Sequence, residues 1–241
     1  MDIKAFKMDG LGNDFVIIDQ RNTQINLSKD QIIRICDRDF IGCDQLILIK
    51  KNRKIDAGLE FYNSDGSASG ACGNGTRCVA SLLSKENNKK EITLWTSGGT
   101  LKSKILEDNL VETEIGVSKT NWKEIPLNKE LDTKNLNIKI LDNNNKEHIG
   151  GTAINVGNPH IIFFVNNLEN YDLNKIGPEI ENHKFFPEKC NVTLAKVNNE
   201  NLIKVKVWER GAGLTKACGT AACATVVVGY LNQLTEKSCN V

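Results

Sequence analysis

The chain of 241 residues lacks several signals that would assign it to a large functional class. Its formal net charge is only +1, which gives no electrostatic reason to expect a nucleic acid or a membrane surface as a partner. No apolar run is long enough to span a bilayer, and the first residues lack the apolar stretch of a signal peptide. We therefore expect a cytoplasmic protein. With 40% hydrophobic and 25% charged residues, the chain has the composition of an ordinary globular protein.

Metal and disulfide signatures are also missing. No C-x-x-C pair occurs among the eight cysteines, and none of the three histidines stands at a zinc-ligand spacing from a cysteine. We expect no bound metal, and most thiols should be reduced and packed as small apolar groups. Cys36 fits this pattern in the apolar segment 32–36, and Cys78 and Cys223 fall inside expected helices.

What the chain does contain is an internal repeat. The Cys-Gly pair at Cys72 recurs at Cys218, an offset of 146 residues. Other matches keep offsets of 145 or 146: Gly12 with Gly157, Asn13 with Asn158, Gln45 with Asn191, and Asn63 with Glu209. Matches in one register predict a duplicated domain, with halves at residues 1–117 and 118–241. The second half is short of final strands, so we expect reduced stability there.

The pattern predicts an α+β fold: two duplicated pseudo-symmetric domains, each a curled mixed β-sheet around a central helix. Strands are expected at residues 16–18, 46–49, 92–95 and 161–165, and hairpins at 101–115 and 194–208. One helix begins at Ser28, where Gln31 completes a capping box. The other helices follow Cys72 and Cys218, and the second is apolar enough to be buried. Segment 116–147 is polar and has no counterpart, so we place the crossover near its start.

A cysteine directly before a helix has a chemical consequence. The N–H groups of the first helical turn point outward and form an anion site, which also favours a thiolate over a thiol. Two such sites in one cleft would hold a carboxylate, with a thiol on each side of the adjacent carbon. Such a site would lower a thiol pKa from about 8.5 into the range of proton transfer at neutral pH.

Each residue also has a plain structural explanation. Glycine after a cysteine permits a tight strand-to-helix turn, and single asparagines are common turn residues. His160 after Asn158-Pro159 suits a capped core residue, and Glu209 with Arg210 suits a solvated ion pair. These explanations account for one copy much better than for two copies in register.

The motifs together resemble the diaminopimelate epimerase family. They are Met-Asp-Gly-Leu-Gly-Asn-Asp-Phe at 8–15, Phe-Tyr-Asn-Ser-Asp-Gly-Ser at 61–67, Cys-Gly-Asn-Gly-Thr-Arg-Cys at 72–78, Gly-Asn-Pro-His at 157–160, Glu-Arg-Gly at 209–211 and Ala-Cys-Gly-Thr at 217–220. The resemblance implies a cofactor-independent isomerase, in lysine and peptidoglycan biosynthesis. It would interconvert LL- and meso-2,6-diaminopimelate and usually form a homodimer.

The resemblance also implies a role for each site residue. Cys72 and Cys218 would be the two acid/base residues, supported by His160 and Glu209. The other residues would bind the substrate: Gly73, Asn74, Gly219 and Thr220 at the reacting carboxylate, Asn63, Asn158, Asn191 and Arg210 at the distal amino-acid end, and Asn13 and Gln45 in the rest of the pocket.

Three positions depart from the family pattern: Asp9 replaces a common His, Gly70-Ala71 a frequent Glu-Met, and Leu214 a frequent Glu. Three other functions stay open. A proline or hydroxyproline racemase would not need the residues expected at a distal amino-acid end, and a non-catalytic amino-acid-binding protein would not need two matched cysteines. A redox protein could use a Cys72–Cys218 disulfide, and we expect oxidation to that disulfide to inactivate an epimerase.

Overall fold

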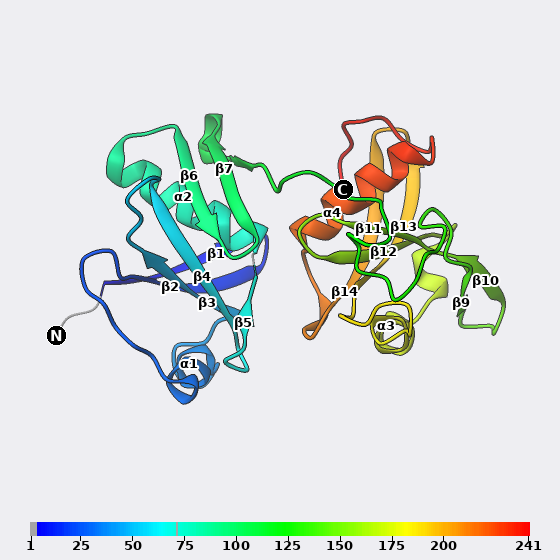
Figure 1. The fold of residues 1–241 in the computed structure, drawn as a ribbon, viewed down its shortest axis with the longest axis horizontal. Coiled ribbons are helices and arrows are strands. Elements are labelled where there is room, and N and C mark those ends of the chain that lie inside the picture. Colours follow the sequence, from blue (N-terminus) through cyan, green and yellow to red (C-terminus); the bar gives the residue numbers. More distant parts are fainter. Residues whose placement is uncertain (1–3, 71) are drawn as a thin grey trace. The chain divides into compact units, whose positions relative to one another are not determined.

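The computed structural model describes residues 4–70 and 72–241, and the chain divides after Gly116 into two compact units (Figure 1). Met1, Asp2, Ile3 and Ala71, which the N-terminal and Cys-Gly predictions include, lie outside the described residues. The assignment of residues 1–117 and 118–241 as two epimerase halves stays a prediction.

The first unit contains one mixed sheet and two α-helices. In chain order its elements are β1 (Ala5–Gly10), β2 (Asn13–Asp19), α1 (Lys29–Cys36), β3 (Gln45–Lys50), β4 (Ala57–Asn63), β5 (Ala68–Ser69), α2 (Gly73–Asn87), β6 (Glu91–Thr96), β7 (Gly99–Ile105), the 3₁₀ helix η1 (Glu107–Asn109) and β8 (Val111–Thr113). The strands pair in the order β1-β2-β3-β4-β6-β7-β8, and β5 pairs with β4. β2 runs parallel to β3, and the other neighbours of these two strands are antiparallel to them.

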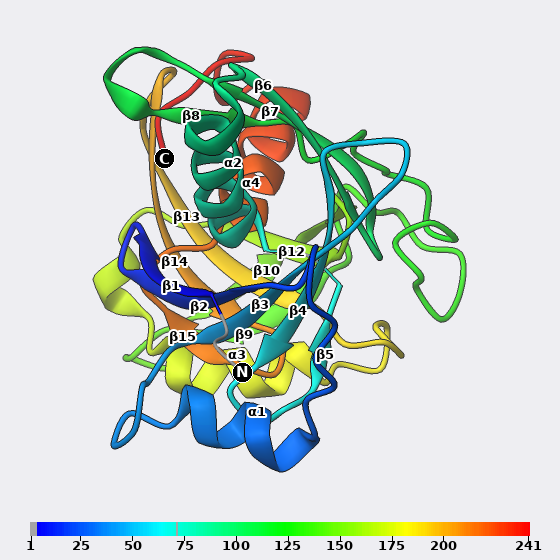
Figure 2. The same cartoon turned by 90° about the vertical axis from the view of Figure 1, so that its left-hand side faces the viewer.

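Alternating residues of β2 and β3 build a core on each face of this sheet, because successive side chains of a strand point to opposite faces. Phe15, Ile17 and Ile47 pack against the buried side of α2. Val16 and Leu46 pack against α1 instead. Figures 1 and 2 accordingly show α1 and α2 on opposite sides of the sheet. The sheet therefore holds the start of α2 close to the ends of β2 and β3.

The second unit contains a five-stranded sheet and a separate hairpin. Its elements are β9 (Ile138–Leu141), β10 (Glu147–Gly150), β11 (Thr152–Asn155), β12 (Pro159–Phe164), the 3₁₀ helix η2 (Leu168–Asn170), α3 (Leu173–Glu181), β13 (Asn191–Asn199), β14 (Leu202–Glu209), β15 (Gly213–Thr215) and α4 (Gly219–Leu231). The five-stranded sheet has the order β11-β12-β13-β14-β15, and β9 pairs with β10. β12 and β13 are parallel, as β2 and β3 are in the first unit.

The residue-level pairing confirms the duplicated fold class. Phe15 pairs with Gln45 across β2 and β3, and His160 pairs with Asn191 across β12 and β13. Leu46 opposite Tyr62 is likewise repeated by Val192 opposite Trp208. The same register in both sheets follows from the offsets of 145 and 146 residues in the sequence. Both expected hairpins and the capping box of Ser28 and Gln31 are present.

Three local features differ from expectation. Segment 116–147 is polar in composition, yet it contributes to the hydrophobic core. Its residues Ile125, Leu127 and Leu136 are buried in the second unit. The prediction that Cys223 is buried is wrong: it lies in α4, but on an exposed side of the helix. Helix α3 was not expected, because Pro178 interrupts its pattern.

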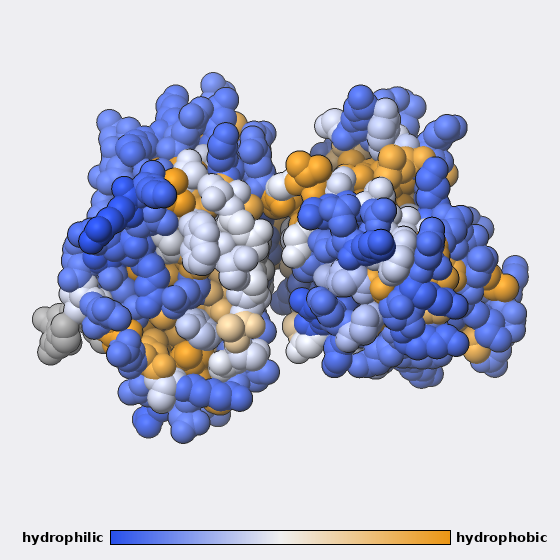
Figure 3. All heavy atoms as spheres, viewed as in Figure 1, coloured by the Kyte–Doolittle hydropathy of each residue, from blue (hydrophilic) through white to orange (hydrophobic). Residues whose placement is uncertain are grey.

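The face drawn in Figure 3 is mostly hydrophilic, with apolar patches on each unit. Among residues 4–70 and 72–241, no helix has both the length and the apolarity needed to cross a membrane.

Candidate active site

The first cysteine motif forms the start of α2. Cys72 is the N-cap, with an extended backbone of φ −140° and ψ 114°, and its Sγ accepts a hydrogen bond from the N–H of Gly75 at 3.5 Å. Gly75 also has a packing role, since a Cβ there would lie 2.6 Å from Cδ1 of Ile47. Glycine therefore lets the first turn of α2 approach the sheet and carry Cys72 with it.

Asn13, at the start of β2, lies beside this cysteine. The Sγ of Cys72 donates to Oδ1 of Asn13 at 3.7 Å, and Nδ2 of Asn74 donates to the same oxygen at 3.4 Å. Nδ2 of Asn13 donates to Oδ2 of Asp44 at 2.9 Å. The side chain predicted to complete the pocket is thus a direct neighbour of the predicted acid/base cysteine.

Gln45 and Asn63 form a second pair at the same end of the sheet. They face each other across β3 and β4, and Nε2 of Gln45 donates to Oδ1 of Asn63 at 2.9 Å. The amide of Asn63 donates onward to Ser67 Oγ at 3.1 Å. Oε1 of Gln45 is buried and has no hydrogen-bond partner among the described residues. A buried acceptor of this kind is costly unless a ligand donor reaches it.

The second cysteine motif repeats the first in backbone but not in side-chain contacts. Cys218 caps α4 with φ −129° and ψ 108°, close to the values at Cys72. Its Sγ shares a hydrogen bond with the hydroxyl of Thr220 at 3.4 Å. In each helix the first two positions, Gly73 with Asn74 and Gly219 with Thr220, have N–H groups directed toward the N-terminal end.

The expected lowering of a thiol pKa does not occur at Cys218. Burial raises the pKa of Cys218 above its usual range, and the negative charge of Glu209 raises it further. The hydroxyl of Thr220 and the amide of Ala221 oppose this effect without cancelling it. Burial and the Glu209 carboxylate thus favour the thiol at this helix start, which the sequence alone did not reveal.

His160 is fully buried behind the start of α4. Its Nε2 lies 2.8 Å from Oδ1 of Asn158 and 3.1 Å from the hydroxyl of Thr220. Burial, with the charge of Arg210, lowers the pKa of His160 to about 3. The ring is therefore neutral near pH 7, and it contacts Cys218 only through Thr220, so it suits a positioning role better than proton transfer.

Asn191 and Arg210 are held by the backbone around them. Nδ2 of Asn191 donates to the carbonyl of Pro159 at 3.0 Å, and Oδ1 accepts from the N–H of Arg210 at 3.0 Å. The guanidinium of Arg210 donates from Nη1 to the carbonyl of Glu188 at 2.8 Å. Asn191 thus uses both ends of its amide to fix the ends of β12 and β14.

Glu209 ends β14, and its Oε1 accepts from the hydroxyl of Thr215 at 2.6 Å. Helix α3 supports the preceding residue. Nε1 of Trp208 donates to Oε2 of the buried Glu181 at 2.7 Å, and Gly177 contacts the Trp208 ring closely. The unexpected helix therefore fixes the end of the strand that carries Glu209.

Comparison with known proteins identifies the family. The family model described as diaminopimelate epimerase matches residues 5–120 and 152–241. The chain belongs to the diaminopimelate epimerase family. Epimerases are isomerases, and this is the enzyme class to which the family belongs. A diaminopimelate epimerase of Pelagibacter ubique (strain HTCC1062) is 75% identical over 241 residues, covering 100% of this chain and 88% of that protein. A diaminopimelate epimerase of Acidiphilium cryptum (strain JF-5) is 40% identical over 98% of this chain and 83% of its own length.

Solved structures outside this close group share the fold. A hydroxyproline epimerase from Agrobacterium vitis has a TM-score of 0.62 at 13% identity, covering 97% of this chain and 78% of that one. A phenazine biosynthesis protein from Bacillus anthracis has a TM-score of 0.61 at 15% identity, covering 94% of this chain and 78% of that one.

In this member of the diaminopimelate epimerase family, sequence reasoning missed one charged cluster near the first cysteine. Asp14 and Asp44 exchange hydrogen bonds with each other's backbone N–H at 3.0 Å, and Arg38 binds both carboxylates. Asp44 directly precedes Gln45 and Asp14 directly follows Asn13. The sequence could have indicated this cluster, because an acidic residue stands directly beside each of these two matched amides.

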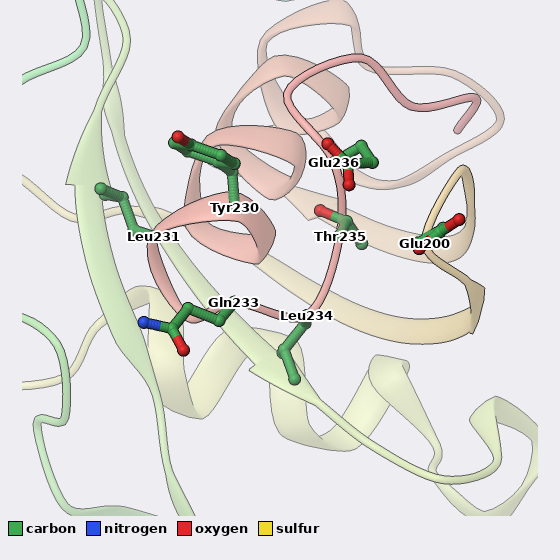
Figure 4. Close-up of a pocket in the computed structure, with 7 residues that line it drawn as sticks. All are labelled: Glu200, Tyr230, Leu231, Gln233, Leu234, Thr235 and Glu236. Carbon is green, nitrogen blue, oxygen red and sulfur yellow. The ribbon is translucent and has the colours of Figure 1, made fainter.

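A cavity of about 530 Å³ lies elsewhere in the second unit of this epimerase-family chain (Figure 4). Its lining comes from the C-terminal end of α4, the tail after it and the β13–β14 hairpin: Glu200, Tyr230, Leu231, Gln233, Leu234, Thr235 and Glu236. Cys218 caps the opposite end of the same helix, about 20 Å away at 1.5 Å per residue over 13 residues. This cavity is therefore separate from the cysteine motif.

Proposed function

We propose that this chain interconverts LL- and meso-2,6-diaminopimelate, a step in lysine and peptidoglycan biosynthesis. The observation that carries the proposal is the 75% identity to a diaminopimelate epimerase along the whole chain. The family match over both halves supports it independently of any single residue.

The proposed mechanism uses two thiols and no cofactor. One cysteine, as thiolate, removes the proton from the reacting α-carbon, and the other, as thiol, delivers its proton to the opposite face. The roles of Cys72 and Cys218 exchange in the reverse direction. Each is the N-cap of a helix of at least 13 residues, and negative charge on the substrate carboxylate is stabilised by such helix N-termini. We assign this carboxylate to the amides of Gly73, Asn74, Gly219 and Thr220.

The remaining residues are proposed to read the substrate. Buried Gln45 Oε1, which has no partner among the described residues, suits an ammonium donor, and Asn13 and Asn63 lie on the same sheet end. Asn158, Asn191 and Arg210 are assigned to the distal amino-acid end of the substrate. The contacts of Asn191 favour an indirect role in substrate binding, because its amide positions the backbone of Arg210.

Glu209 and His160 are proposed to support the reacting centre and its ammonium group. Glu209 raises the pKa of Cys218 through its charge, so an arriving ammonium would relieve that effect by neutralising the carboxylate. His160 supports the same cysteine by holding Thr220. We further propose a homodimer, and the cytoplasmic location stays a prediction.

The decisive assay is conversion of pure LL-diaminopimelate to the meso isomer by reduced protein, followed by chiral chromatography. Proline and trans-4-hydroxyproline serve as the alternative substrates. Turnover of diaminopimelate without turnover of either proline substrate supports the proposal. Turnover of a proline would assign the chain to the racemases instead, and tight binding without turnover would make it a binding protein. Light scattering of the same preparation tests the homodimer.

A further inference from the structure

The acidic residue Asp44 lies outside the proposed substrate contacts, yet it is linked to them. Its Oδ1 accepts from Nη2 of Arg38 at 2.6 Å. Its Oδ2 accepts two hydrogen bonds, from the backbone N–H of Asp14 at 3.0 Å and from Nδ2 of Asn13 at 2.9 Å. Arg38 also binds both oxygens of Asp14, at 2.7 and 2.9 Å, which anchors the cluster. Asp44 is therefore fixed on three sides before any substrate binds.

This arrangement decides which end of the Asn13 amide faces the cysteine. A carboxylate paired with a guanidinium only accepts hydrogen bonds, so the group of Asn13 that contacts Asp44 is the NH₂. Its carbonyl oxygen must then point to α2, where the Sγ of Cys72 lies at 3.7 Å and Nδ2 of Asn74 at 3.4 Å. Nδ2 of Asn74, whose Oδ1 accepts from Nη2 of Arg77, favours the same orientation through one hydrogen bond of 3.4 Å. Without an acceptor at position 44, the Asn13 amide could turn by 180° and present its NH₂ to the sulfur at the cost of that one hydrogen bond.

The two orientations have opposite effects on the thiol. A carbonyl oxygen accepts from S–H and favours the protonated cysteine, whereas an NH₂ donates to S⁻ and favours the thiolate. We propose that Asp44 is a positioning residue that orients the Asn13 amide and thereby holds Cys72 as a hydrogen-bonded thiol. The inference rests on the proposed function only in taking Cys72 as an acid/base residue.

Other charged residues lie on α2 and on the strands that pack against it, and their effects have to be separated from this one. Lys7 and Asp9 lie on β1, Asp14 on β2, and Arg77 on α2, in addition to Arg38 and Asp44. Removing Asp44 also removes a negative charge, which by itself lowers a neighbouring thiol pKa. A test must therefore change the acceptor and the charge independently.

Substitution of Asp44 by Asn or Ala makes this separation. In Asp44→Asn the charge is lost but one side-chain oxygen stays. We expect this oxygen to face Asn13 and the Asp14 N–H, because two donors meet at the position of Oδ2 and one, from Arg38, at that of Oδ1. In Asp44→Ala both the charge and the oxygen are lost. The rate of alkylation by iodoacetamide is measured against pH without substrate, and the tryptic peptide of residues 55–77 contains Cys72 as its single cysteine.

We expect the midpoint for Cys72 to move to lower pH by about one unit in Asp44→Ala, the usual scale of such environmental effects, and to move clearly less in Asp44→Asn, where only the charge is lost. In the Asn13→Ala background, Asp44→Ala should add no more than the charge effect measured in Asp44→Asn. An equal shift in both Asp44 variants, or a full Asp44→Ala shift that persists without Asn13, would overturn the proposal.

Two further points keep the test decisive. If Asp44→Ala does not fold, Asn13→Ala alone must still lower the midpoint, and an unmoved midpoint there contradicts the proposal. The alkylation measurement contains no substrate, so it does not depend on epimerase activity. If the wild type shows no turnover in the separate assay, the proposed function is wrong but the alkylation result remains valid. A failure of the Asp44 inference can therefore be told apart from a failure of the proposed function.

Discussion

At the scale of single residues, the two matched cysteines have unlike partners. Cys72 donates to the neutral amide of Asn13 and accepts from Gly75, whereas Cys218 lies near the carboxylate Glu209 and contacts Thr220. Both sets of partners favour the thiol in the free protein, whereas a two-base epimerase also needs one thiolate. We therefore expect a thiolate to form at Cys218 only when the ammonium group of the substrate neutralises Glu209. The backbone conformation of Cys72 is repeated at Cys218, but the side chains in contact with the two sulfur atoms differ.

The first prediction concerns Glu209. Since burial and this carboxylate raise the pKa of Cys218, alkylation of Cys218 by iodoacetamide should have a midpoint above that of an ordinary thiol, near ~8.5. Glu209→Gln removes the negative charge and should lower the midpoint. Tandem mass spectrometry separates Cys218 from Cys223 in their shared tryptic peptide. An unchanged midpoint would show that Glu209 does not act on this sulfur.

The second prediction concerns His160 and acid stability. Burial lowers its pKa to about 3, whereas an unfolded histidine titrates near ~6.5. Between these values the unfolded chain binds more protons, so the free energy of unfolding falls as pH falls, by at most about 1.4 kcal/mol per pH unit. Urea unfolding at pH 7 and pH 5 should show a smaller difference for His160→Gln than for wild type.

The control for this prediction is His183→Gln. Burial also lowers the pKa of His183, but this ring is only half-buried and should contribute a smaller slope. Equal pH dependence of the wild type and the His160 variant would contradict the assignment of a neutral buried ring.

At the scale of elements, helix α3 is what sequence reasoning missed and what the site depends on. The helix begins with Asp172 as N-cap, and Leu173, Ile176 and Ile180 form its buried side. Its close approach to Trp208 needs a glycine at position 177, where a Cβ would lie 2.4 Å from the indole ring. α3 thereby supports the end of β14, from which Glu209 and Arg210 extend.

The third prediction follows from this contact. Alanine is normally better than glycine inside a helix by about 1 kcal/mol, but in Gly177→Ala the clash with Trp208 should reverse the sign. We expect the overpacking cost of about 1–3 kcal/mol, less the helix gain of about 1 kcal/mol, to leave a net loss of up to about 2 kcal/mol in the free energy of unfolding, measured by urea titration. Gly58→Ala, in strand β4, controls for the added methyl group alone, because its Cβ would meet only ordinary contacts at 3.6 Å or more. A stabilised Gly177→Ala would contradict the close packing.

Sequence patterns predicted the repeated parts of the fold better than the unrepeated parts. The strands around Gln45 and Asn191 and the helices after the two cysteines were visible because alternation, capping and the repeat agreed. Segment 116–147 and α3 were not, because their apolar residues are sparse and Pro178 lies inside a helical pattern. Within the site, the sequence indicated which residues are matched. It could not show that the amide of Asn191 is engaged by backbone or that Asp44 orients Asn13, since both depend on distances between strand ends.

At the scale of the whole molecule, the account assigns one acid/base residue to each duplicated unit. The fourth prediction is that Cys72→Ala and Cys218→Ala each lower kcat by at least about 10²–10⁴-fold, the usual contribution of general acid–base catalysis. The two losses should be similar although the substitutions lie in different units. Circular dichroism must show wild-type secondary structure. Full activity of either variant would contradict a two-base mechanism, and inactivation through a Cys72–Cys218 disulfide stays a prediction.

The most direct test of the central claim is epimerisation in deuterated water. Reduced protein is incubated with pure LL-diaminopimelate, and stereochemistry and deuterium content are followed by NMR and mass spectrometry. We expect meso product with one deuterium at the inverted carbon, because the proton delivered comes from a thiol that has exchanged with solvent. Neither product nor exchange from folded protein, or meso product that retains the original hydrogen, would contradict it.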